Sequence, residues 1–582
     1  MKTTKLDTPP RRRRLFPLLL AAVLAVLFWK SFLPNYVHFS NDGPLAQQNA
    51  RWSQLPAAMT GMWDDLNDIG SNAGVSPPSM SALIHVIFGP VGYSKFLAPV
   101  ALFILGLGAW TFFRQLKLTP LAVTLGALAT ALNSAFFSDV CWGTASHQIA
   151  IGMDFFALAL VVSNSAETSW PLRLTRLALA GMAVGLNVME ALDIGAIFSV
   201  FIAAFVFYRA LVETDAVFLK KTVRGIGQVA VISLFAGFIA TQIVVSLIST
   251  QIVGVAGTAQ NEQTKAAHWD FATQWSFPKA ETLSLFVPGL FGYRMNTGDG
   301  SDYWGAVGRD AAWDRYFANG SQGTPPDPQQ RFIRFSGGGD YAGVLVVLVA
   351  LWAALQSLRK QNAAFSENQR RLIGFWSIVA VISLLLAWGR FAPFYQILYS
   401  LPYFSTIRNP TKFLLIFSWA VVILFAYGIH GLNKRYLEIP AANVKSSIAQ
   451  LQSWWKNVRG FDRKWTIGCG LAIVASFLAW LIYFSQQPAL VKYLQTILFG
   501  EDLAKQVAAF SFHQAGWFIV LLAVAVGLLT LVLSGVFAGR RAKWGGFLLG
   551  AFLIADLARA NHHWIVYWNY PEKYASNPIL DR

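Results

Sequence analysis

The chain has 582 residues, of which 55% are hydrophobic and only 13% are charged. This balance lies outside the range of soluble globular domains and indicates a protein that folds in a lipid bilayer. The net charge of +17 is also typical of nucleic-acid-binding proteins. Here the basic residues are dispersed over many short links, so we expect no nucleic-acid partner.

Roughly thirteen apolar segments follow one another, most of them close to the ~20 residues that a helix needs to cross the hydrocarbon core. They lack the polar–apolar alternation of barrel strands, and only helices or closed barrels satisfy their backbone in lipid. The sequence therefore predicts an all-α, polytopic bundle of transmembrane helices. The predicted spans are residues 15–35, 93–113, 119–137, 148–164, 174–188, 194–209, 225–249, 341–357, 373–388, 411–431, 466–485, 515–537 and 545–560.

The links between these spans alternate in chemistry. Arg11 to Arg14 precede the first span, and every second link after it is short and basic, whereas the other links are longer and hold most of the acidic residues. Basic links remain in the cytoplasm, so the pattern predicts a multi-pass protein of a bacterial cytoplasmic membrane, with the N-terminus inside and the C-terminus outside. The basic links also predict contact with anionic membrane lipids.

The lengths of the links suggest how the chain is organised. The predicted order is an N-terminal transmembrane module (1–340) that carries the outer loops 36–92 and 250–340, then C-terminal transmembrane helices (341–560), then an outer C-terminal tail (561–582). Long loops in a compact fold are usually functional or disordered. The polar inner link 433–465 predicts one short amphipathic helix on the membrane surface.

Asp42 is the first candidate for chemistry. It follows the first span in SNDGPLAQ, where Gly43 and Pro44 favour a turn. A carboxylate at the membrane surface can act as a general base or bind a divalent cation. The alternative is an ordinary turn in which the Asp side chain bonds its own backbone.

Two further pairs of ionisable residues fall at short outer turns. Glu190 and Asp193 lie between two apolar spans, where ionisable groups usually face a cavity or a partner; the alternative is that they cap the flanking helices. Asp139 and His147 bracket the turn SDVCWGTASHQ. A histidine there can contact substrate or be an ordinary interfacial residue, and nothing around it suggests a nucleophile elbow.

Arg408 and Lys412 lie in STIRNPTKF, at the predicted outer start of a span, and Pro410 suits the first turn of that helix. A helix N-terminus with two cations is a natural phosphate site. The alternative is that both side chains reach up to lipid headgroups. Cys141 and Cys469 fall at opposite membrane faces, so we expect no disulfide. No Cys/His cluster has metal-ligand spacing, and whether a metal is bound stays open.

These carboxylates and cations all fall on the predicted outer face. A base beside a phosphate site at lipid depth suits the transfer of a group from a lipid phosphate to a hydroxyl, because the base takes the acceptor proton while the cations stabilise the departing phosphate.

Four stretches resemble the YfhO-like family of bacterial multi-pass membrane proteins: NDG (41–43), WSFPKAETLSLFVP (275–288), YAG (341–343) and LPYFSTIRNPTKF (401–413). That family looks related to the C-type (GT-C) integral membrane glycosyltransferases. The resemblance implies a polyprenyl-phosphate sugar as donor and Asp42 as the catalytic acid/base, and it places Arg408 on the R-x-P position of the family. Many relatives have GDG where this chain has NDG, and members often continue outward after the last span.

The sequence thus predicts a membrane glycosyltransferase that moves a sugar from a polyprenyl phosphate to an extracytoplasmic cell-envelope glycan or polymer. Asp42 would be the base, Arg408 and Lys412 would hold the donor phosphate, and Glu190 or Asp193 would orient the acceptor or bind a divalent cation. Two alternatives stay open. One is a transporter or lipid flippase that uses Glu190 and Asp193 as ion sites, and the other is a non-catalytic membrane assembly protein.

Overall fold

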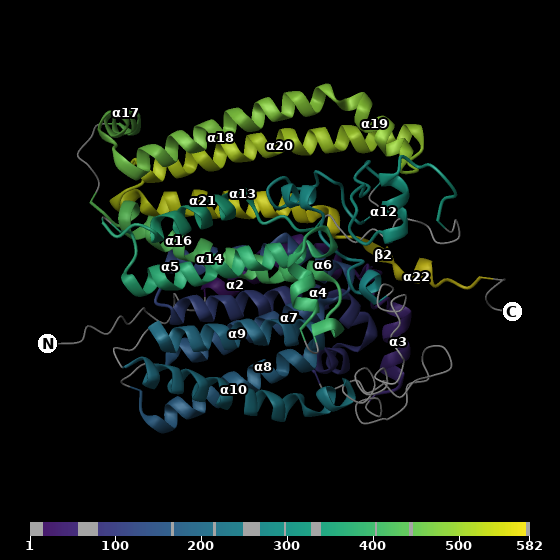
Figure 1. The fold of residues 1–582 in the computed structure, drawn as a ribbon, viewed down its shortest axis with the longest axis horizontal. Coiled ribbons are helices and arrows are strands. Elements are labelled where there is room, and N and C mark those ends of the chain that lie inside the picture. The colour runs from purple at the N-terminus through teal and green to yellow at the C-terminus, as the bar shows by residue number, and fades with distance from the viewer. Residues whose placement is uncertain are drawn as a thin grey trace. The chain divides into compact units, whose positions relative to one another are not determined.

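The computed structural model describes residues 15–55, 79–164, 168–212, 217–247, 268–295, 298–326, 339–361, 363–401, 404–440 and 446–577. These residues are overwhelmingly helical, and their only named strands are β1 (Tyr36–His38) and β2 (Tyr567–Asn569). Ten of the described helices are long and apolar enough to cross a membrane. The predicted all-α, polytopic helical fold is therefore confirmed (Figure 1).

Each predicted span coincides with a helix. In chain order these helices are α2 (Leu15–Leu27), α4 (Met80–Gln115), α5 (Pro120–Leu132) with α6 (Ser134–Trp142), α7 (Ala145–Ser163), α8 (Trp170–Glu190), α9 (Leu192–Val212), α10 (Phe218–Leu247), α13 (Val344–Ser357), α14 (Glu367–Ala387), α16 (Phe413–Leu432), α18 (Gly460–Ser485), α20 (Glu501–Leu533) and α21 (Ala542–Asn561). Two of them, α2 and α13, are shorter apolar helices, and α21 is not among the ten. The span count and the orientation therefore stay predictions.

The chain divides into two compact units. The first comprises Met1–Ala131, Asp139–Ala256 and Ile565–Arg582, and the second comprises Leu132–Ser138 and Gly257–Trp564. The boundary predicted at residue 340 falls inside the second unit, and that division of the chain stays a prediction.

In the first unit, α4, α7, α8, α9 and α10 pack on one another (Figure 1). Glycines let α4 and α7 approach closely, as small residues do between helices in lipid. A Cβ on Gly108 would lie 2.5 Å from the carbonyl oxygen of Gly152, which leaves no room for a larger residue. The pair Asp154 and Asn187 joins α7 to α8, because the Asn187 amide donates to Asp154 Oδ1 at 2.5 Å.

The predicted outer loop 36–92 is only partly a loop. It contains β1, then α3 (Leu45–Ser53), and from Met80 onward it is already helical. Ser79 caps α4 by accepting from the Ala82 N–H at 3.2 Å. α4 continues past Gly89 and Pro90 with a kink, since Gly89 adopts φ 65°.

The segment predicted as a separate tail also belongs to the first unit. β2 pairs with β1 in antiparallel register, with Val37 opposite Trp568. The Ser31 and Tyr567 hydroxyls share a hydrogen bond of 2.9 Å beside this ladder. Residues from the two ends of the chain thus form one small sheet.

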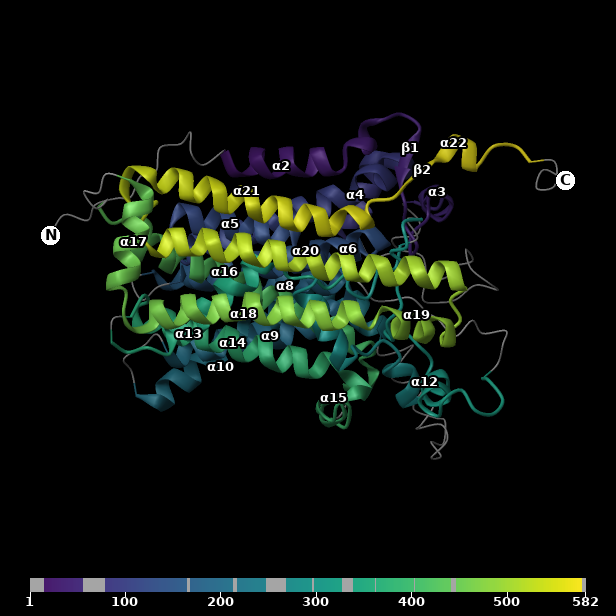
Figure 2. The same cartoon turned by 90° about the horizontal axis from the view of Figure 1, so that it is seen from above.

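In the second unit, α13, α14 and α16 pack together, and α18 pairs with α20 (Figure 2). Trp376 and Trp419 meet edge to face between α14 and α16, at 4.9 Å between ring centroids. A Cβ on Gly428 would lie 2.5 Å from the Val349 carbonyl oxygen, so this glycine sets the approach of α16 to α13. Near α20, the helices α12 (Ala311–Ala318) and α19 (Gln487–Thr496) pack their aromatic and aliphatic side chains into one buried cluster.

A buried carboxylate holds the start of α13. Asp556, on α21, accepts from the Tyr341 hydroxyl at 2.7 Å and from the Val344 N–H at 3.1 Å. Gly343 provides φ 93° just before the helix begins. The carboxylate thus shares with the Tyr341 hydroxyl, which lies 3.0 Å from the Val344 nitrogen, the task of satisfying a backbone donor at the helix end.

We expect Asp556→Ala to destabilise the protein by roughly 2–6 kcal/mol, since two buried donors would each lose a partner at about 1–3 kcal/mol. Thermal unfolding of the purified protein in detergent measures the effect as a fall in Tm. The Tm of Asp556→Asn, which keeps one acceptor oxygen, should fall less than that of Asp556→Ala. An equal Tm for wild type and Asp556→Ala would contradict the capping role.

Candidate functional site

Asp42 lies in the turn between β1 and α3, and its backbone is fixed to the turn that joins α6 to α7. The N–H groups of Asn41 and Asp42 both donate to the Trp142 carbonyl, at 2.8 and 3.4 Å. The Asn41 side-chain amide donates to Asp42 Oδ1 at 2.7 Å, and the Asp42 side chain is exposed. The carboxylate is therefore both held in place and accessible.

Gly143 makes this approach possible. It adopts φ 119°, and a Cβ at this position would lie 2.9 Å from the Asp42 nitrogen and would collide with Ser40 Oγ. A larger residue would therefore push the Asp42 turn away and would also strain its own backbone.

Asp139, on α6, meets His147, on α7, across the turn that joins these two helices. Asp139 Oδ2 lies 2.7 Å from His147 Nδ1 and accepts from Gln148 Nε2 at 2.9 Å, while Oδ1 accepts from the Thr144 hydroxyl at 2.6 Å. Both side chains are largely buried. A carboxylate at Nδ1 orients the imidazole ring and stabilises its protonated form. The structure thus brings three predicted site residues, Asp42, Asp139 and His147, to one turn.

Glu190 and Asp193 act at helix ends. Glu190 Oε1 and Oε2 each lie 3.2 Å from the Ser81 N–H, and the Ser81 hydroxyl also donates to Oε1. Glu190 therefore caps the start of α4 from a different helix, α8. Asp193 Oδ1 accepts from the Ile194 N–H at 2.8 Å in the first turn of α9. These contacts favour the capping interpretation over an ion site.

Arg408 and Lys412 lie in the second unit. Arg408 is exposed and its guanidinium sits 5.5 Å from the Phe271 ring centroid. Pro410 opens the helical stretch that leads into α16, which confirms that part of the prediction. A phosphate site at Arg408 and Lys412 stays a prediction.

Two of the motifs that carry the family resemblance pack on each other. The Asn409 N–H donates to the Ala272 carbonyl at 2.8 Å, and the Thr411 N–H donates to the Trp275 carbonyl at 3.0 Å. Asn409 itself has φ 65°, the left-handed conformation that Asn tolerates better than most residues. Backbone pairing therefore joins the stretch 401–413 to the stretch 275–288 and to Ala272 just before it.

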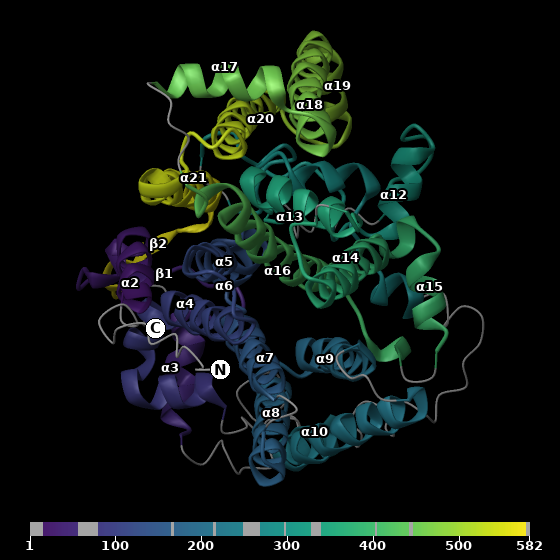
Figure 3. The same cartoon turned by 90° about the vertical axis from the view of Figure 1, so that its left-hand side faces the viewer.

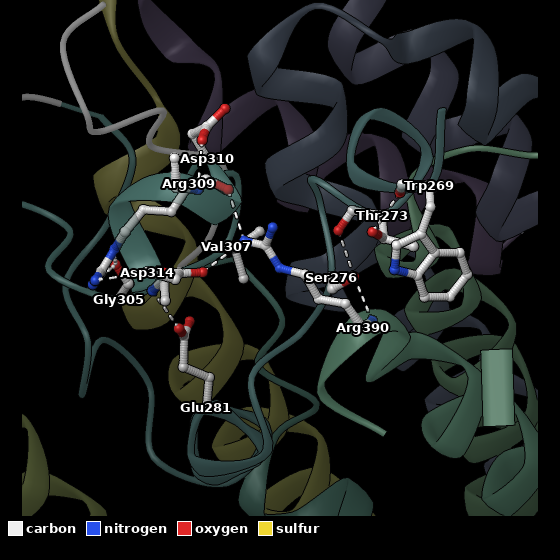
Figure 4. Close-up of polar contacts among 12 residues, drawn as sticks. Trp269, Thr273, Ser276, Glu281, Gly305, Val307, Arg309, Asp310, Asp314 and Arg390 are labelled. Carbon is white, nitrogen blue, oxygen red and sulfur yellow. Dashed lines mark hydrogen bonds and ion pairs between the residues drawn. The ribbon is translucent and has the colours of Figure 1, made fainter. Parts of the chain in front are cut away.

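The sequence analysis missed a buried polar cluster on the second predicted outer segment (Figure 4). Glu281 accepts from the Tyr303 hydroxyl at 2.5 Å and from the Ala306 N–H at 2.7 Å. Burial raises the pKa of Glu281 to about 7, and these hydrogen bonds limit the rise. Nearby, Arg390 donates to Asp314 at 2.7 Å and to the Arg309 carbonyl at 2.7 Å.

The signal for this cluster was available but weak. Glu281 stands in the quoted stretch WSFPKAETLSLFVP, as an acidic residue in an otherwise apolar and aromatic segment. The intramembrane Asp154 was also missed, although a lone Asp inside an apolar span marks a buried partner. That partner, Asn187, lies on the next helix along the chain. Neither the residue types nor their spacing in the sequence identified Asn187 as the partner of Asp154.

Metal binding finds no support within the described part of the chain, where no group of three or more His, Cys, Asp and Glu side chains has an arrangement that could hold an ion. Cys141 and Cys469 are both buried and free.

Comparisons with known proteins give remote likenesses. ArnT from Cupriavidus metallidurans bound to undecaprenyl phosphate aligns at 13% identity with a TM-score of 0.42, over 94% of this chain and 77% of that one. The oligosaccharyltransferase of Archaeoglobus fulgidus in the apo form aligns at 14% identity with a TM-score of 0.38, over 72% of this chain and 50% of that one. No family model and no curated protein matches the sequence. At such low identities and TM-scores the likeness carries no argument about activity.

The pKa of Glu281 makes stability depend on pH. It is about 7 in the folded protein against 4.5 for an unperturbed Glu. The contribution of Glu281 is therefore fully present below about pH 4.5 and is lost as the pH rises through about 7. We expect the Tm of the wild type in detergent to fall over this range by more than that of Glu281→Gln, which cannot titrate.

Glu367→Gln is the matched control, because the Glu367 side chain is 66% exposed and pairs only with its helix neighbour Arg371 among the contacts described. Its Tm should follow the wild-type pH profile. A Glu281→Gln profile that parallels the wild type would show that Glu281 does not titrate in this window.

Proposed function

We propose that this chain is an integral membrane glycosyltransferase of a bacterial cytoplasmic membrane. It would move a sugar from a polyprenyl-phosphate donor to an extracytoplasmic cell-envelope acceptor. The observation that supports this most is the exposed carboxylate of Asp42, held on the same turn as the Asp139–His147 pair. The four quoted motifs support membership of the YfhO-like family as part of this proposal.

In this reaction Asp42 is the general base. It takes the proton of the acceptor hydroxyl as the hydroxyl oxygen bonds to the anomeric carbon of the sugar and the bond from that carbon to the phosphate oxygen breaks. Polyprenyl phosphate leaves with the bonding electrons. The hydrogen bond from Asn41 orients the Asp42 carboxylate, and the exposure of its side chain leaves it open to an acceptor. His147, oriented by Asp139, would contact a substrate hydroxyl.

Arg408 and Lys412 would hold the donor phosphate, and this part rests on the predicted topology that puts them on the same membrane face as Asp42. Glu190 and Asp193 would serve acceptor binding only indirectly, through the helix ends that they cap. The transporter alternative relied on these two carboxylates as ion sites. Their bonds to helix N-termini leave that alternative with little support.

We expect Asp42→Asn to reduce sugar transfer by about 100-fold or more, the lower end of what a general base contributes. The assay uses cells that lack the protein and carry either the wild type or the variant at equal membrane levels, and mass spectrometry quantifies their envelope glycans. The purified variant should still bind undecaprenyl phosphate. This separates a loss of chemistry from a loss of binding.

Asp502→Asn is the matched control, because Asp502 is an exposed aspartate at the start of α20 in the other unit. It should restore wild-type glycan levels. If Asp42→Asn restores the wild-type glycan level in full, Asp42 is not the base. This is the result expected of a transporter or an assembly protein. If no glycan depends on the protein at all, the transferase proposal itself is wrong.

A further inference from the structure

The amphipathic helix predicted in the link 433–465 exists, and it is exposed on several sides. It is α17 (Ser447–Asn457), capped by the Ser446 hydroxyl, which accepts from the Ala449 N–H at 3.1 Å. None of its residues is buried. A short helix so little covered by its own protein is stable only if something else covers its apolar side chains.

α17 lies crosswise over the ends of α18 and α20, which belong to the same unit (Figures 2 and 3). Because α18 and α20 are candidate spans, a helix that crosses their ends runs along the bilayer surface rather than through it. Two contacts fix it there. Gln450 donates to the Ser534 carbonyl at 3.0 Å, and Arg541 donates to Ser447 Oγ at 3.4 Å.

The two fixed residues define the face of α17 that meets the protein. Ile448 and Trp455, seven residues apart, share a different face, and they are 71% and 47% exposed. Trp544, at the adjoining start of α21, is 58% exposed. Tryptophans and aliphatic side chains in such a position favour the boundary between headgroups and acyl chains.

Exposed basic side chains are frequent on α17 and on the helix ends beside it. The exposed cations on α17 and on the flanking ends of α16, α18, α20 and α21 are Lys434, Lys456, Arg459, Arg463, Lys464, Arg540, Arg541 and Lys543. Only two acidic residues, Glu438 and Asp462, occur in the described parts of these stretches. Both accept side-chain hydrogen bonds, from Asn433 and Tyr436 respectively. The surface around α17 is therefore strongly cationic.

We propose that α17 and these flanking cations form a binding site for anionic phospholipid, with Ile448 and Trp455 inserted at the acyl boundary and the basic side chains on the phosphates. Charge complementarity selects this occupant, because a cationic rim around an apolar stripe matches an anionic headgroup above its acyl chains. The predicted cytoplasmic position of this link faces it to the leaflet that carries the negative surface potential. The proposal is independent of the reaction assigned to Asp42.

The test measures the apparent affinity of the purified full chain for phosphatidylglycerol in detergent, by titration with native mass spectrometry. The triple variant Lys456→Gln/Arg540→Gln/Lys543→Gln removes three cations that have no side-chain contact in the described structure. We expect its affinity for phosphatidylglycerol to fall at least 10-fold. The loss of affinity has an upper limit of about 5-fold for each cation removed. This is equivalent to the ~1 kcal/mol that one basic residue contributes near an anionic surface.

The matched control is Lys279→Gln/Arg315→Gln/Lys492→Gln, which removes the same charge from exposed positions remote in sequence from α17. It should keep wild-type affinity for phosphatidylglycerol, and affinity for zwitterionic phosphatidylcholine should not change in either variant. Trp455→Ala should weaken retention of both lipids. A triple variant that binds phosphatidylglycerol like the wild type would overturn the proposal. So would a triple variant that loses a protein partner while its affinity for lipid stays unchanged.

Salt dependence tests the wild type without any substitution, so misfolding of a variant cannot obscure the result. Raising salt from about 0.05 M to about 0.5 M should weaken phosphatidylglycerol binding several-fold and leave phosphatidylcholine binding unchanged, because salt screens exposed charges. Equal salt dependence for the two lipids would contradict a cationic site.

Discussion

Helix ends in apolar surroundings must find partners for their unpaired backbone groups, and this requirement organises much of the molecule. Charged side chains from other helices meet it. Glu190 binds the N–H groups at the start of α4, and Asp556 does so at the start of α13. At the end of α7, Arg209 donates to the carbonyls of Val161, Val162 and Asn164. Carboxylates meet N-termini and a guanidinium meets a C-terminus, as the helix dipole favours.

The same requirement changes how the ionisable residues are interpreted. A carboxylate at membrane depth is usually a sign of function, yet Glu190 and Asp556 carry out a structural task at this depth. Asp42 differs from them because its side chain is exposed and the one bond described for its carboxylate comes from its neighbour Asn41. Among the carboxylates of the described residues, one that does not cap a helix is a better candidate for catalysis than one that does.

Motif residues divide in a similar way. The stretches around Trp275 and Asn409 contact each other through backbone hydrogen bonds, so their pairing supports the fold whatever the activity. Glu281 lies in one of these stretches. Burial raises its pKa to about 7, and the hydrogen bond from the Tyr303 hydroxyl limits that rise. The link that carries α17 contributes differently, since Ile448 and Trp455 are exposed on it and we propose that they contact lipid. Backbone pairing and a titrating carboxyl group thus occur in the same stretch, 275–288, whereas the proposed lipid contact involves α17.

Hydrophobic length and the spacing of polar links were enough to predict a helical membrane protein and the helix at every predicted span, because backbone satisfaction in lipid leaves few alternatives. The same local signals predicted the surface helix α17, the turn that carries Asp42 and the turn that Asp139 and His147 bracket. They did not reveal that β2 pairs with β1 or that Asp154 meets Asn187. These contacts join residues distant in sequence, and their energies depend on which helices pack side by side. Only the folded chain decides that.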